Sequence, residues 1–562
     1  MGVTMHAPLD ALAEEALTRS FAADPLSANV VGARDFDQEL PNLSEAFEER
    51  RRAELDDIER RAARIDPAEL DAEDWVTHAT LLFQTRAQRR ALDARKVEFA
   101  VTPTLGGVHT RILQLVPKVT LAEPQHAGAY LQRCTRVGHY LQQASQRHRQ
   151  GVARARTPSA RGVIGVIDQV DRYLATPLDR DPLLWPAAPT GWRGADVWRD
   201  ELMGVLDSVV RPAMARYRDH LRDEVLDHAR PDERSGLCCL LDGGEVYAQA
   251  IQEHTTTALD AEEIHQLGLD LVTALADEYR ALGGTTLGLQ EPDDIFDRLR
   301  NDPALRFQTG GQVRRAAQEA LARAEATAPA WFGRLPRGGC VVGEIPQVEA
   351  PEAPIAYYLP PELGGPRPGR YWVNTSQPQT RTRFECEALA FHESVPGHHL
   401  QCALAQELDL PRFRRLTLLT AYVEGWGLYA ERLADEMGLY SSDLTRLGML
   451  SMDSLRAGRL VVDTGLHAKG WSRQQAVDFL RRNSPQAHNN IDNEVDRYIA
   501  WPGQAVAYMI GRLEIERLRD RARMRLGDRF DLPGFHDAVL GHGAVPLGVL
   551  QEIIDRWIDS HR

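Results

Sequence analysis

One run of the chain, Phe391–Gln401, most constrains how the chain can fold, because it combines candidate metal ligands with a helix-breaking pair. Residues 392–399 read His-Glu-Ser-Val-Pro-Gly-His-His, which places three histidines and one glutamate within eight residues. His392 followed by Glu393 is how a helical zinc-hydrolase motif begins, in which the histidine binds the metal and the glutamate deprotonates the metal-bound water. The run therefore predicts a metal-dependent hydrolase, with a peptidase as the first expectation.

The spacing of these histidines departs from the usual motif, whose ligands lie at positions i and i+4 on one helical face. Position i+4 is Pro396, which cannot bind a metal. On an unbroken helix, His398 would lie about 240° round and about 9 Å along the axis, and His399 about 10.5 Å along it. Because proline disrupts a helix and glycine adopts unusual dihedral angles, a bulge at Pro396-Gly397 could return His398 to the metal. We therefore prefer His398 as the second ligand, with His399 as the alternative.

Two flanking segments favour a metal site over the simpler interpretation, a helix end followed by polar histidines. Upstream, Thr382-Arg-Phe-Glu385 fits a capping box, so a helix should begin there and place His392 about three turns in. Downstream, residues 421–433 predict a largely apolar helix with Glu424 near its start. Glu424 would be the third ligand and leave one position open for water, unless it lies on a solvated helix face. Glu431, on the same face two turns later, could support the site or lie exposed.

The segment Arg497–Gly511 supplies further candidates. Pro502 could start a helix that places Gln504 and Tyr508 four residues apart on one face. Zinc hydrolysis needs a donor for the developing oxyanion, and the hydroxyl of Tyr508 would serve because its ordinary pKa is near 10. Otherwise Tyr508 is a core aromatic. Arg497 could hold a substrate carboxylate, although a structural salt bridge is the simpler interpretation.

A segment rich in proline and glycine, residues 346–379, precedes the metal run. Within it, residues 370–375 read Arg-Tyr-Trp-Val-Asn-Thr and predict a short strand. We expect either an edge strand, which can hold a peptide through backbone hydrogen bonds, or a surface loop with a structural hairpin.

Composition bounds the class of protein. The chain has 562 residues, 43% of them hydrophobic, and a net charge of −15, which favours solubility and argues against a nucleic-acid surface. The six cysteines show no C-x-x-C pair, so we expect reduced thiols. No signal peptide is visible, and no apolar stretch approaches the ~20 residues of a membrane span. We therefore expect a cytoplasmic protein without nucleic-acid or membrane partners, and the sequence does not predict its oligomeric state.

Taken together, several motifs resemble the family catalogued as domain of unknown function 885, whose members look like zinc peptidases of the gluzincin type. The matching runs are His254–Thr257 with Glu263–Gly268, Arg367–Tyr371 with Asn374-Thr375, His392–His399, Glu424–Trp426 with Tyr429–Glu431, and Pro502–Ala505 with Tyr508. The resemblance implies a mainly α protein with two helical lobes around a deep cleft and a small β-sheet near the metal helix. It is broadly similar to thimet-type oligopeptidases, helical carboxypeptidases and dipeptidyl peptidase III.

The resemblance also assigns roles. It implies a helical N-terminal lobe over residues 1–230, a helical middle region over 231–350 and a catalytic metal-binding region over 351–562, within one continuous family domain. The expected function is Zn²⁺-dependent hydrolysis of peptide bonds in short peptides, by carboxypeptidase-like or oligopeptidase-like cleavage. The alternative is a specialised amide hydrolase or tailoring enzyme that acts on one small metabolite. The resemblance implies His392, His398 and Glu424 as metal ligands and Glu393 as the catalytic base. The other candidates are Tyr508 as a second catalytic group and Tyr371, Asn374, Arg497 and Gln504 as substrate-binding residues.

Overall fold

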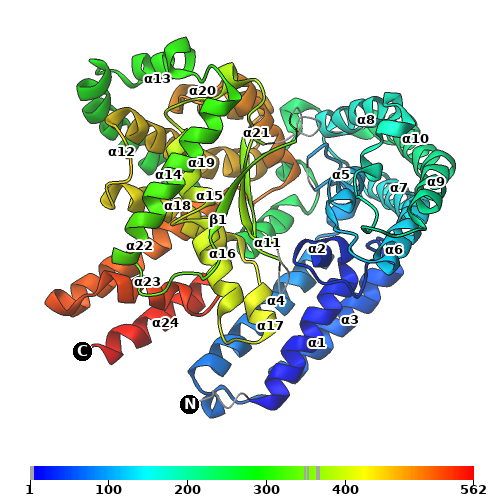
Figure 1. Cartoon of the computed structure of the whole chain (residues 1–562), viewed down its shortest axis with the longest axis horizontal. Coiled ribbons are helices and arrows are strands. Elements are labelled where there is room, and N and C mark those ends of the chain that lie inside the picture. Colours follow the sequence, from blue (N-terminus) through cyan, green and yellow to red (C-terminus); the bar gives the residue numbers. More distant parts are fainter. Residues whose placement is uncertain (1–5, 105, 347–349, 351–353, 363–366) are drawn as a thin grey trace.

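The structure is a computed structural model that describes residues 6–104, 106–346, 350, 354–362 and 367–562. It is mainly helical, with a three-stranded sheet, so the predicted fold class is confirmed (Figure 1). Two large buried clusters of apolar side chains form most of the core. One lies within residues 26–225, and the other gathers residues from 237 to 558 together with a few from the first hundred. The predicted domain boundaries and the deep cleft stay predictions.

The helices of the first 220 residues are coloured blue to cyan-green in Figure 1 and lie largely on one side of the molecule. Their amphipathic sequences bury apolar side chains against one another, as α8 shows with Val163, Val166 and Val170 on its inner face. The helices are α1 (Ala7–Ala23), α2 (Pro25–Val30), α3 (Glu45–Ala62), α4 (Ala72–Asp93), α5 (Val108–Gln114), α6 (Pro124–Thr135), α7 (Val137–Ala153), α8 (Ala160–Ala175), α9 (Ala195–Val205) and α10 (Arg211–His220).

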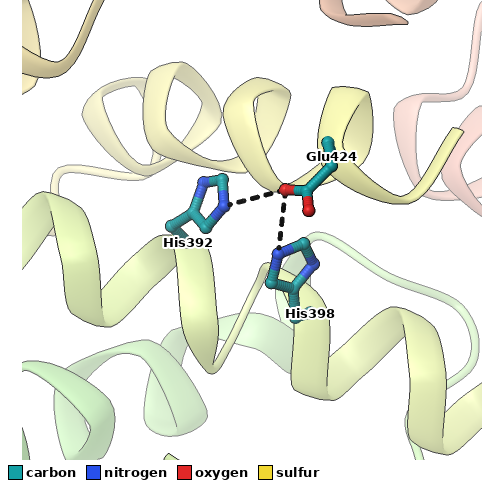
Figure 2. A group of neighbouring side chains, drawn as sticks. All are labelled: His392, His398 and Glu424. Carbon is teal, nitrogen blue, oxygen red and sulfur yellow. Dashed lines mark ion pairs between the residues drawn. The ribbon is translucent and has the colours of Figure 1, made fainter. Parts of the chain in front are cut away.

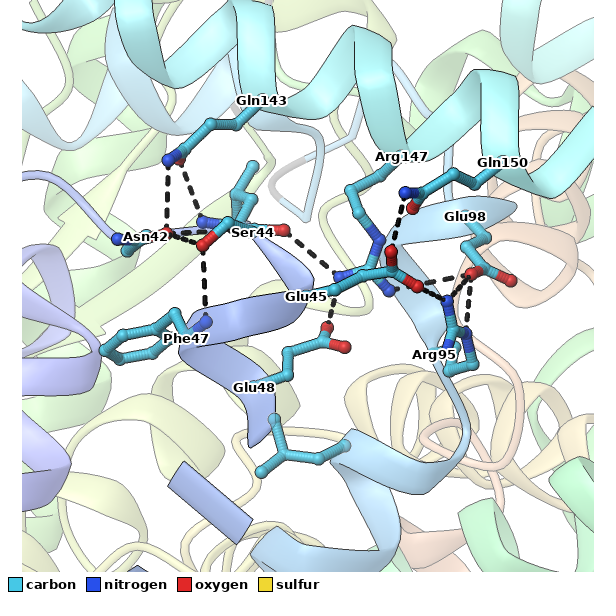
Figure 3. Close-up of polar contacts among 12 residues, drawn as sticks. Asn42, Ser44, Glu45, Phe47, Glu48, Arg95, Glu98, Gln143, Arg147 and Gln150 are labelled. Atoms are coloured by element: carbon cyan, nitrogen blue, oxygen red, sulfur yellow. Dashed lines mark hydrogen bonds and ion pairs between the residues drawn. The ribbon is translucent and has the colours of Figure 1, made fainter. Parts of the chain in front are cut away.

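Buried charges join the start of α3 to α7 and to the segment after α4 (Figure 3). Arg147 is 1% exposed and pairs with Glu48 at 2.7 Å. The fully buried carboxylate of Glu98 accepts hydrogen bonds of 2.6 Å from both Arg95 and Arg154. Because a buried charge without its partner is strongly destabilising, this network fixes how the three segments sit against one another.

Four helices lead from this part of the chain to the sheet. A capping box opens α12, with Asp260 and Glu263 bonded to each other's backbone N–H groups. The helices are α11 (Gly243–Thr255), α12 (Ala261–Leu287), α13 (Pro292–Asn301) and α14 (Gly310–Thr327).

The sheet contains β1 (Cys340–Glu344), β2 (Ala356–Leu359) and β3 (Gly369–Val373) in the order β1-β3-β2. β3 is parallel to β1 and antiparallel to β2. The predicted strand is present, and of its two alternative interpretations the edge strand is excluded, because β3 is hydrogen-bonded on both sides and has no free edge for a peptide. Parts of the segment 346–379 lie outside the described residues. As expected, the sheet lies near the metal run, since β2 contacts α15 (Cys386–Glu393) and β3 contacts α16 (His398–Glu407).

The remaining helices pack around α19, whose residues 447–467 are all buried. A helix buried on every side belongs in the centre of a large core, and α12, α15, α18 and α20 to α22 contact it. The helices that follow α16 are α17 (Arg412–Leu416), α18 (Thr420–Glu436), α19 (Asp443–His467), α20 (Arg473–Asn483), α21 (His488–Ala500), α22 (Ala507–Leu526), α23 (Leu532–Leu540) and α24 (Leu547–Ser560). No helix in the described part of the chain is both long enough and apolar enough to cross a membrane.

Two predicted helix starts are wrong. The helix expected to open at Thr382 begins at Cys386, because the Glu385 carboxylate accepts a 2.6 Å hydrogen bond from Gln486 instead of capping the Thr382 backbone. His392 therefore lies in the last turn of an eight-residue helix.

The helix expected to begin at Pro502 begins at Ala507. The residues before it form a turn in which Gly503 has a φ of +78° and donates its N–H to Asp463 at 3.0 Å. That turn holds the chain out of helical geometry, so Gln504 lies outside the helix.

Candidate metal centre

The sequence between the two histidines folds as a tight turn between α15 and α16. Helix α15 ends at Glu393, the Val395–Pro396 peptide bond is cis, and α16 begins at His398. A Cβ atom on Gly397 would lie 2.0 Å from the carbonyl oxygen of His392, so the turn can close this tightly only with glycine. The predicted bulge is present. It brings His392 and His398 close together, whereas an unbroken helix would keep them apart along its axis.

Three side chains converge where the turn meets α18. His392 Nε2 and His398 Nε2 lie 3.5 Å and 3.4 Å from the same oxygen of Glu424, Oε2 (Figure 2). One ligand atom from each residue lies within 4.8 Å of those of the other two. His399 points elsewhere, with Nδ1 3.0 Å from the Tyr358 hydroxyl and Nε2 3.0 Å from a backbone carbonyl. The geometry therefore brings His398, and not His399, to His392 and Glu424.

These separations fit a divalent cation. Two ligand atoms that bind Zn²⁺ at about 2.0–2.1 Å with tetrahedral geometry lie about 3.3 Å apart. The two His–Glu distances of 3.5 Å and 3.4 Å are close to that value. Two imidazole nitrogens and one carboxylate are also a donor set that zinc accepts in hydrolases. The residues present can therefore hold a zinc ion.

Helix α18 is shaped to receive the His392 ring. A Cβ atom on Gly427 would lie 2.7 Å from Cε1 of His392, so a side chain at this position would displace the imidazole. Gly425 lies against α22, where its added Cβ would be 2.5 Å from the backbone of Gly511. The two glycines on either side of Trp426 therefore permit two close approaches on opposite faces of α18, one to the His392 ring and one to α22.

Glu431 supports His392 from behind. Its Oε1 atom lies 2.8 Å from Nδ1 of His392, and its side chain is fully buried. A carboxylate in this position fixes the orientation of a metal-binding imidazole and raises its basicity. The site-supporting interpretation of Glu431 thus agrees with the structure, whereas the exposed one does not. Nδ1 of His398 is buried without a hydrogen-bond partner in the described part of the chain.

The opposite charges within the cluster shift the pKa values of His392 and Glu424 in opposite directions. Burial lowers the pKa of His392, but the hydrogen bonds to Glu424 and Glu431 outweigh burial and raise it to about 9. Burial raises the pKa of Glu424, and the two histidines outweigh that effect and hold the pKa well below its usual range. Without a metal, Glu424 is therefore an anion stabilised by positive charge, which a bound cation would supply instead.

Glu393 lies beside the cluster without belonging to it. Its side chain is half-buried, and among the described residues no hydrogen bond or ion pair occupies its carboxylate. Burial raises the pKa of Tyr371 well above its usual value, and the nearby charge of Glu393 contributes to that rise. Glu393 is therefore an acidic group next to His392 whose carboxylate makes no hydrogen bond or ion pair with the described residues.

Tyr508 faces the ligands from the first turn of α22. Its ring centroid lies 6.5 Å from that of His392, with the two planes 16° apart. Gln504 does not share its helical face, contrary to prediction, and accepts a 2.6 Å hydrogen bond from Arg497. Arg497 also pairs with Glu494 at 3.1 Å, as the salt-bridge interpretation expected.

The other two substrate-binding candidates are held within the fold. Tyr371 is 1% exposed on β3. The Asn374 amide donates a 2.8 Å hydrogen bond to the carbonyl oxygen of Ala350, and its oxygen accepts one from the Ser376 hydroxyl at 2.6 Å. These hydrogen bonds engage both ends of the Asn374 amide with neighbouring parts of its own segment.

Sequence reasoning missed two residues near the site, Arg456 and Arg459. Both are buried on α19, and their guanidinium carbons lie 6.0 Å and 4.6 Å from the Tyr508 ring centroid. Their separation of one helical turn was the available signal, but nothing in the sequence placed that face of α19 against Tyr508.

A family model described as "Bacterial protein of unknown function (DUF885)" matches residues 25–554. A candidate lipoprotein from Colwellia psychrerythraea has a similar structure, with a TM-score of 0.91, 26% identity and coverage of 98% of this chain and 99% of that one. A candidate lipoprotein of unknown function from Shewanella oneidensis gives a TM-score of 0.74 at 17% identity, covering 97% and 98% of the two chains. A candidate oligoendopeptidase F from Bacillus anthracis str. Ames covers 90% and 96% of the two chains at 11% identity, but its TM-score of 0.33 carries no argument. Comparison with curated proteins gives no match.

Proposed function

The chain belongs to the DUF885 family of bacterial proteins, and we propose that it is a zinc-dependent peptidase of the gluzincin type that cleaves short peptides. One observation carries the proposal. A single oxygen of Glu424 lies 3.5 Å and 3.4 Å from Nε2 of His392 and His398, while no described residue bonds to the neighbouring carboxylate of Glu393. Ligands and base in this relationship are what metal-assisted hydrolysis of an amide bond requires.

Each residue has a separate role in the proposal. His392, His398 and Glu424 would hold the ion, and Glu431 would orient His392. When bound, zinc supplies Lewis acidity for the carbonyl under attack and for the attacking water. Glu393 would accept the proton of that water and deliver it to the leaving amine. Tyr508 would donate a hydrogen bond to the developing oxyanion. Because His and Glu accept several divalent ions, Mn²⁺ or Co²⁺ could replace zinc.

The burial of the ligands supports short substrates. His392 and His398 are only 3% and 8% exposed, so the surface of a folded protein would not reach them. An extended peptide or its terminus can enter where a folded domain cannot. The cytoplasmic location and the absence of nucleic-acid and membrane partners stay predictions.

The test compares the wild-type protein with Glu393→Gln. Both proteins are loaded with zinc, their zinc content is measured, and they are incubated with a mixed pool of synthetic peptides followed by mass spectrometry. Glu393→Gln should retain one zinc per chain and lose cleavage by several orders of magnitude, because the base is absent but the ligands remain. Glu407→Gln, on neighbouring α16, is the matched control and should cleave as the wild type does. Near-normal cleavage by Glu393→Gln would refute the mechanism. No cleavage by zinc-loaded wild type would refute a general peptidase.

A further inference from the structure

Two buried arginines of α19 flank the proposed active site. Arg456 and Arg459, here called the arginine pair, are each 6% exposed. Both guanidinium groups lie against Tyr508, at 6.0 Å and 4.6 Å from its ring centroid. The Tyr508 ring in turn lies 6.5 Å from the His392 ring. The arginine pair is therefore one aromatic side chain away from a metal ligand.

The arginine pair is incompletely neutralised. Arg459 pairs with Glu494 at 2.7 Å, but Glu494 also serves Arg497 at 3.1 Å. Arg459 Nη1 is buried and has no hydrogen-bond partner in the described part of the chain.

Arg456 is the less well matched of the two. Its nearest carboxylate, Glu431, is 3.9 Å away and is already engaged by His392 at 2.8 Å. Within the described part of the chain, its other polar contacts are with Met452 alone, through the carbonyl oxygen at 3.5 Å and the sulfur at 2.9 Å, and its Nε atom is buried without a partner there. Burying a guanidinium without a matching anion is unfavourable. The fold thus keeps unsatisfied cationic N–H groups beside the metal ligands, where a ligand can satisfy them.

We infer that the arginine pair is a carboxylate-binding subsite, and that the substrate carries a free carboxylate close to the bond that is cleaved. The inference rests on the proposed function. A guanidinium group presents two parallel N–H donors that match the two oxygens of a carboxylate. The Tyr508 ring centroid lies 6.5 Å from that of His392 and 4.6 Å from the guanidinium carbon of Arg459. The guanidinium carbon is therefore no farther from the His392 ring than the sum of these two distances, which is about the length of three extended residues at ~3.5 Å each. A peptide C-terminus would reach the subsite while one of its last peptide bonds lies at the ligands, which gives carboxypeptidase-like cleavage.

The first experiment compares substrates that differ in their carboxylate. An N-acetylated alanine tetrapeptide is offered as the free acid, as the C-terminal amide, and as an amide with aspartate at the third position. The wild type should show a kcat/KM for the free acid about tenfold to a hundredfold above that for the plain amide, as expected for a charge-assisted hydrogen bond. If the aspartate amide matches the free acid, the carboxylate is that of an acidic side chain. Equal rates for all three would overturn the inference.

Substitution assigns the preference to the arginine pair. Arg456→Gln should reduce the acid-to-amide ratio of kcat/KM to within about threefold of one. Arg456→Lys keeps the charge but loses the planar fork, so it should give an intermediate ratio and serves if the glutamine variant does not fold. Arg446→Gln is the matched control, because it makes the same change at a more exposed position of the same helix and should keep the wild-type ratio. An undiminished ratio in both Arg456 variants would overturn the assignment.

A binding measurement separates this inference from the proposed function. Zinc-loaded Glu393→Gln protein is titrated calorimetrically with the free acid and with the amide of the same peptide. The free acid should bind at least tenfold more tightly, and adding Arg456→Gln should remove the difference. Equal affinities would overturn the subsite. The Glu393→Gln protein could bind the free acid selectively while the wild type cleaves no peptide. That combination would support the carboxylate subsite and refute the peptidase function.

Discussion

The indole nitrogen of Trp426 donates a 2.9 Å hydrogen bond to the carbonyl oxygen of Pro396. Trp426 is fully buried on α18, two residues after Glu424, and Pro396 lies in the turn between His392 and His398. One helix therefore supplies the carboxylate of the cluster and also fixes the turn that brings the two histidines together. The preorganisation of the site therefore depends on the hydrogen bond from Trp426 to Pro396 as well as on the three convergent side chains.

Replacing Trp426 with phenylalanine keeps most of the apolar volume but removes the donor. A buried carbonyl that loses its partner costs about 1–3 kcal/mol, so Trp426→Phe should lower the thermal unfolding midpoint and weaken zinc binding. Both are measured on the full chain, by calorimetry and by competition with a chromogenic chelator. Trp557→Phe, at a partly buried tryptophan of α24 remote from the site, should leave zinc affinity unchanged. A Trp426→Phe protein with wild-type zinc affinity would show that the turn holds its shape without this bond.

Gly427→Ala tests the contact between α18 and the His392 ring. The new Cβ atom would lie 2.7 Å from Cε1 of the imidazole, so the ring must move away from Glu424. We expect zinc affinity to fall at least tenfold while the helical circular-dichroism spectrum is retained. Gly128→Ala, in α6, meets no atom within 4 Å and should leave zinc affinity unchanged. Wild-type zinc affinity in Gly427→Ala would mean that the ring tolerates the displacement.

Glu431→Gln keeps the shape of the side chain that supports His392 and removes its charge. Loss of such a supporting carboxylate typically reduces metal affinity about tenfold to a hundredfold, so a fall of that size is the expected result. Glu436→Gln, on the same helix but paired with Arg519 near the surface, is the control. Equal zinc affinities of the two variants would show that Glu431 contributes to folding and not to the orientation of His392.

Asp463 predicts a pH dependence that is independent of the metal. Its Oδ1 accepts hydrogen bonds from Tyr247 and Gly503, whereas its Oδ2 is buried without a partner among the described residues. Burial raises the pKa of Asp463 to about 7 against those two hydrogen bonds.

The direction of the stability change depends on whether the folded or the unfolded chain loses the Asp463 proton at lower pH. Between about pH 4 and pH 7 the unfolded chain loses this proton while the folded chain keeps it, so this group makes the protein less stable as pH rises. Asp463→Asn places an amide where Oδ2 was and should raise the unfolding midpoint at pH 8 relative to the wild type, with little difference at pH 4. Asp520→Asn, at an exposed position, is the control. Parallel shifts at the two pH values would contradict the assignment.

How far the site follows from sequence depends on whether local geometry sets it. His392, Glu393, His398 and Glu424 could all be named in advance, because residue chemistry and a helix-breaking Pro-Gly pair restrict the ways in which they can meet. The preference for His398 over His399 could not be settled from sequence, since both follow the same turn, and only the folded chain shows His398 at Glu424 and His399 at Tyr358 and the Gly338 carbonyl. The position of Glu431 behind His392 likewise depends on the packing of α15 against α18.

The wrong expectations have the same origin. Residues 370–375 have the composition of a strand, but whether a strand is an edge or a centre depends on which other segments pair with it. Thr382 and Pro502 carry valid helix-start signals, yet Glu385 bonds to Gln486 and Gly503 bonds to Asp463, residues distant in sequence. Tertiary hydrogen bonds thus outweighed local capping preferences of about 1 kcal/mol.

Residue type and short-range spacing were enough to name the candidate ligands and their chemistry, and the combined motifs were enough to indicate the family and, through that resemblance, a mainly helical fold. Three features depend on the folded chain: which histidine reaches Glu424, what orients His392, and the position of two incompletely paired arginines of α19 beside Tyr508. Those contacts join residues 26 to 52 positions apart, and their geometry is set by the packing of buried helices, which no local pattern encodes.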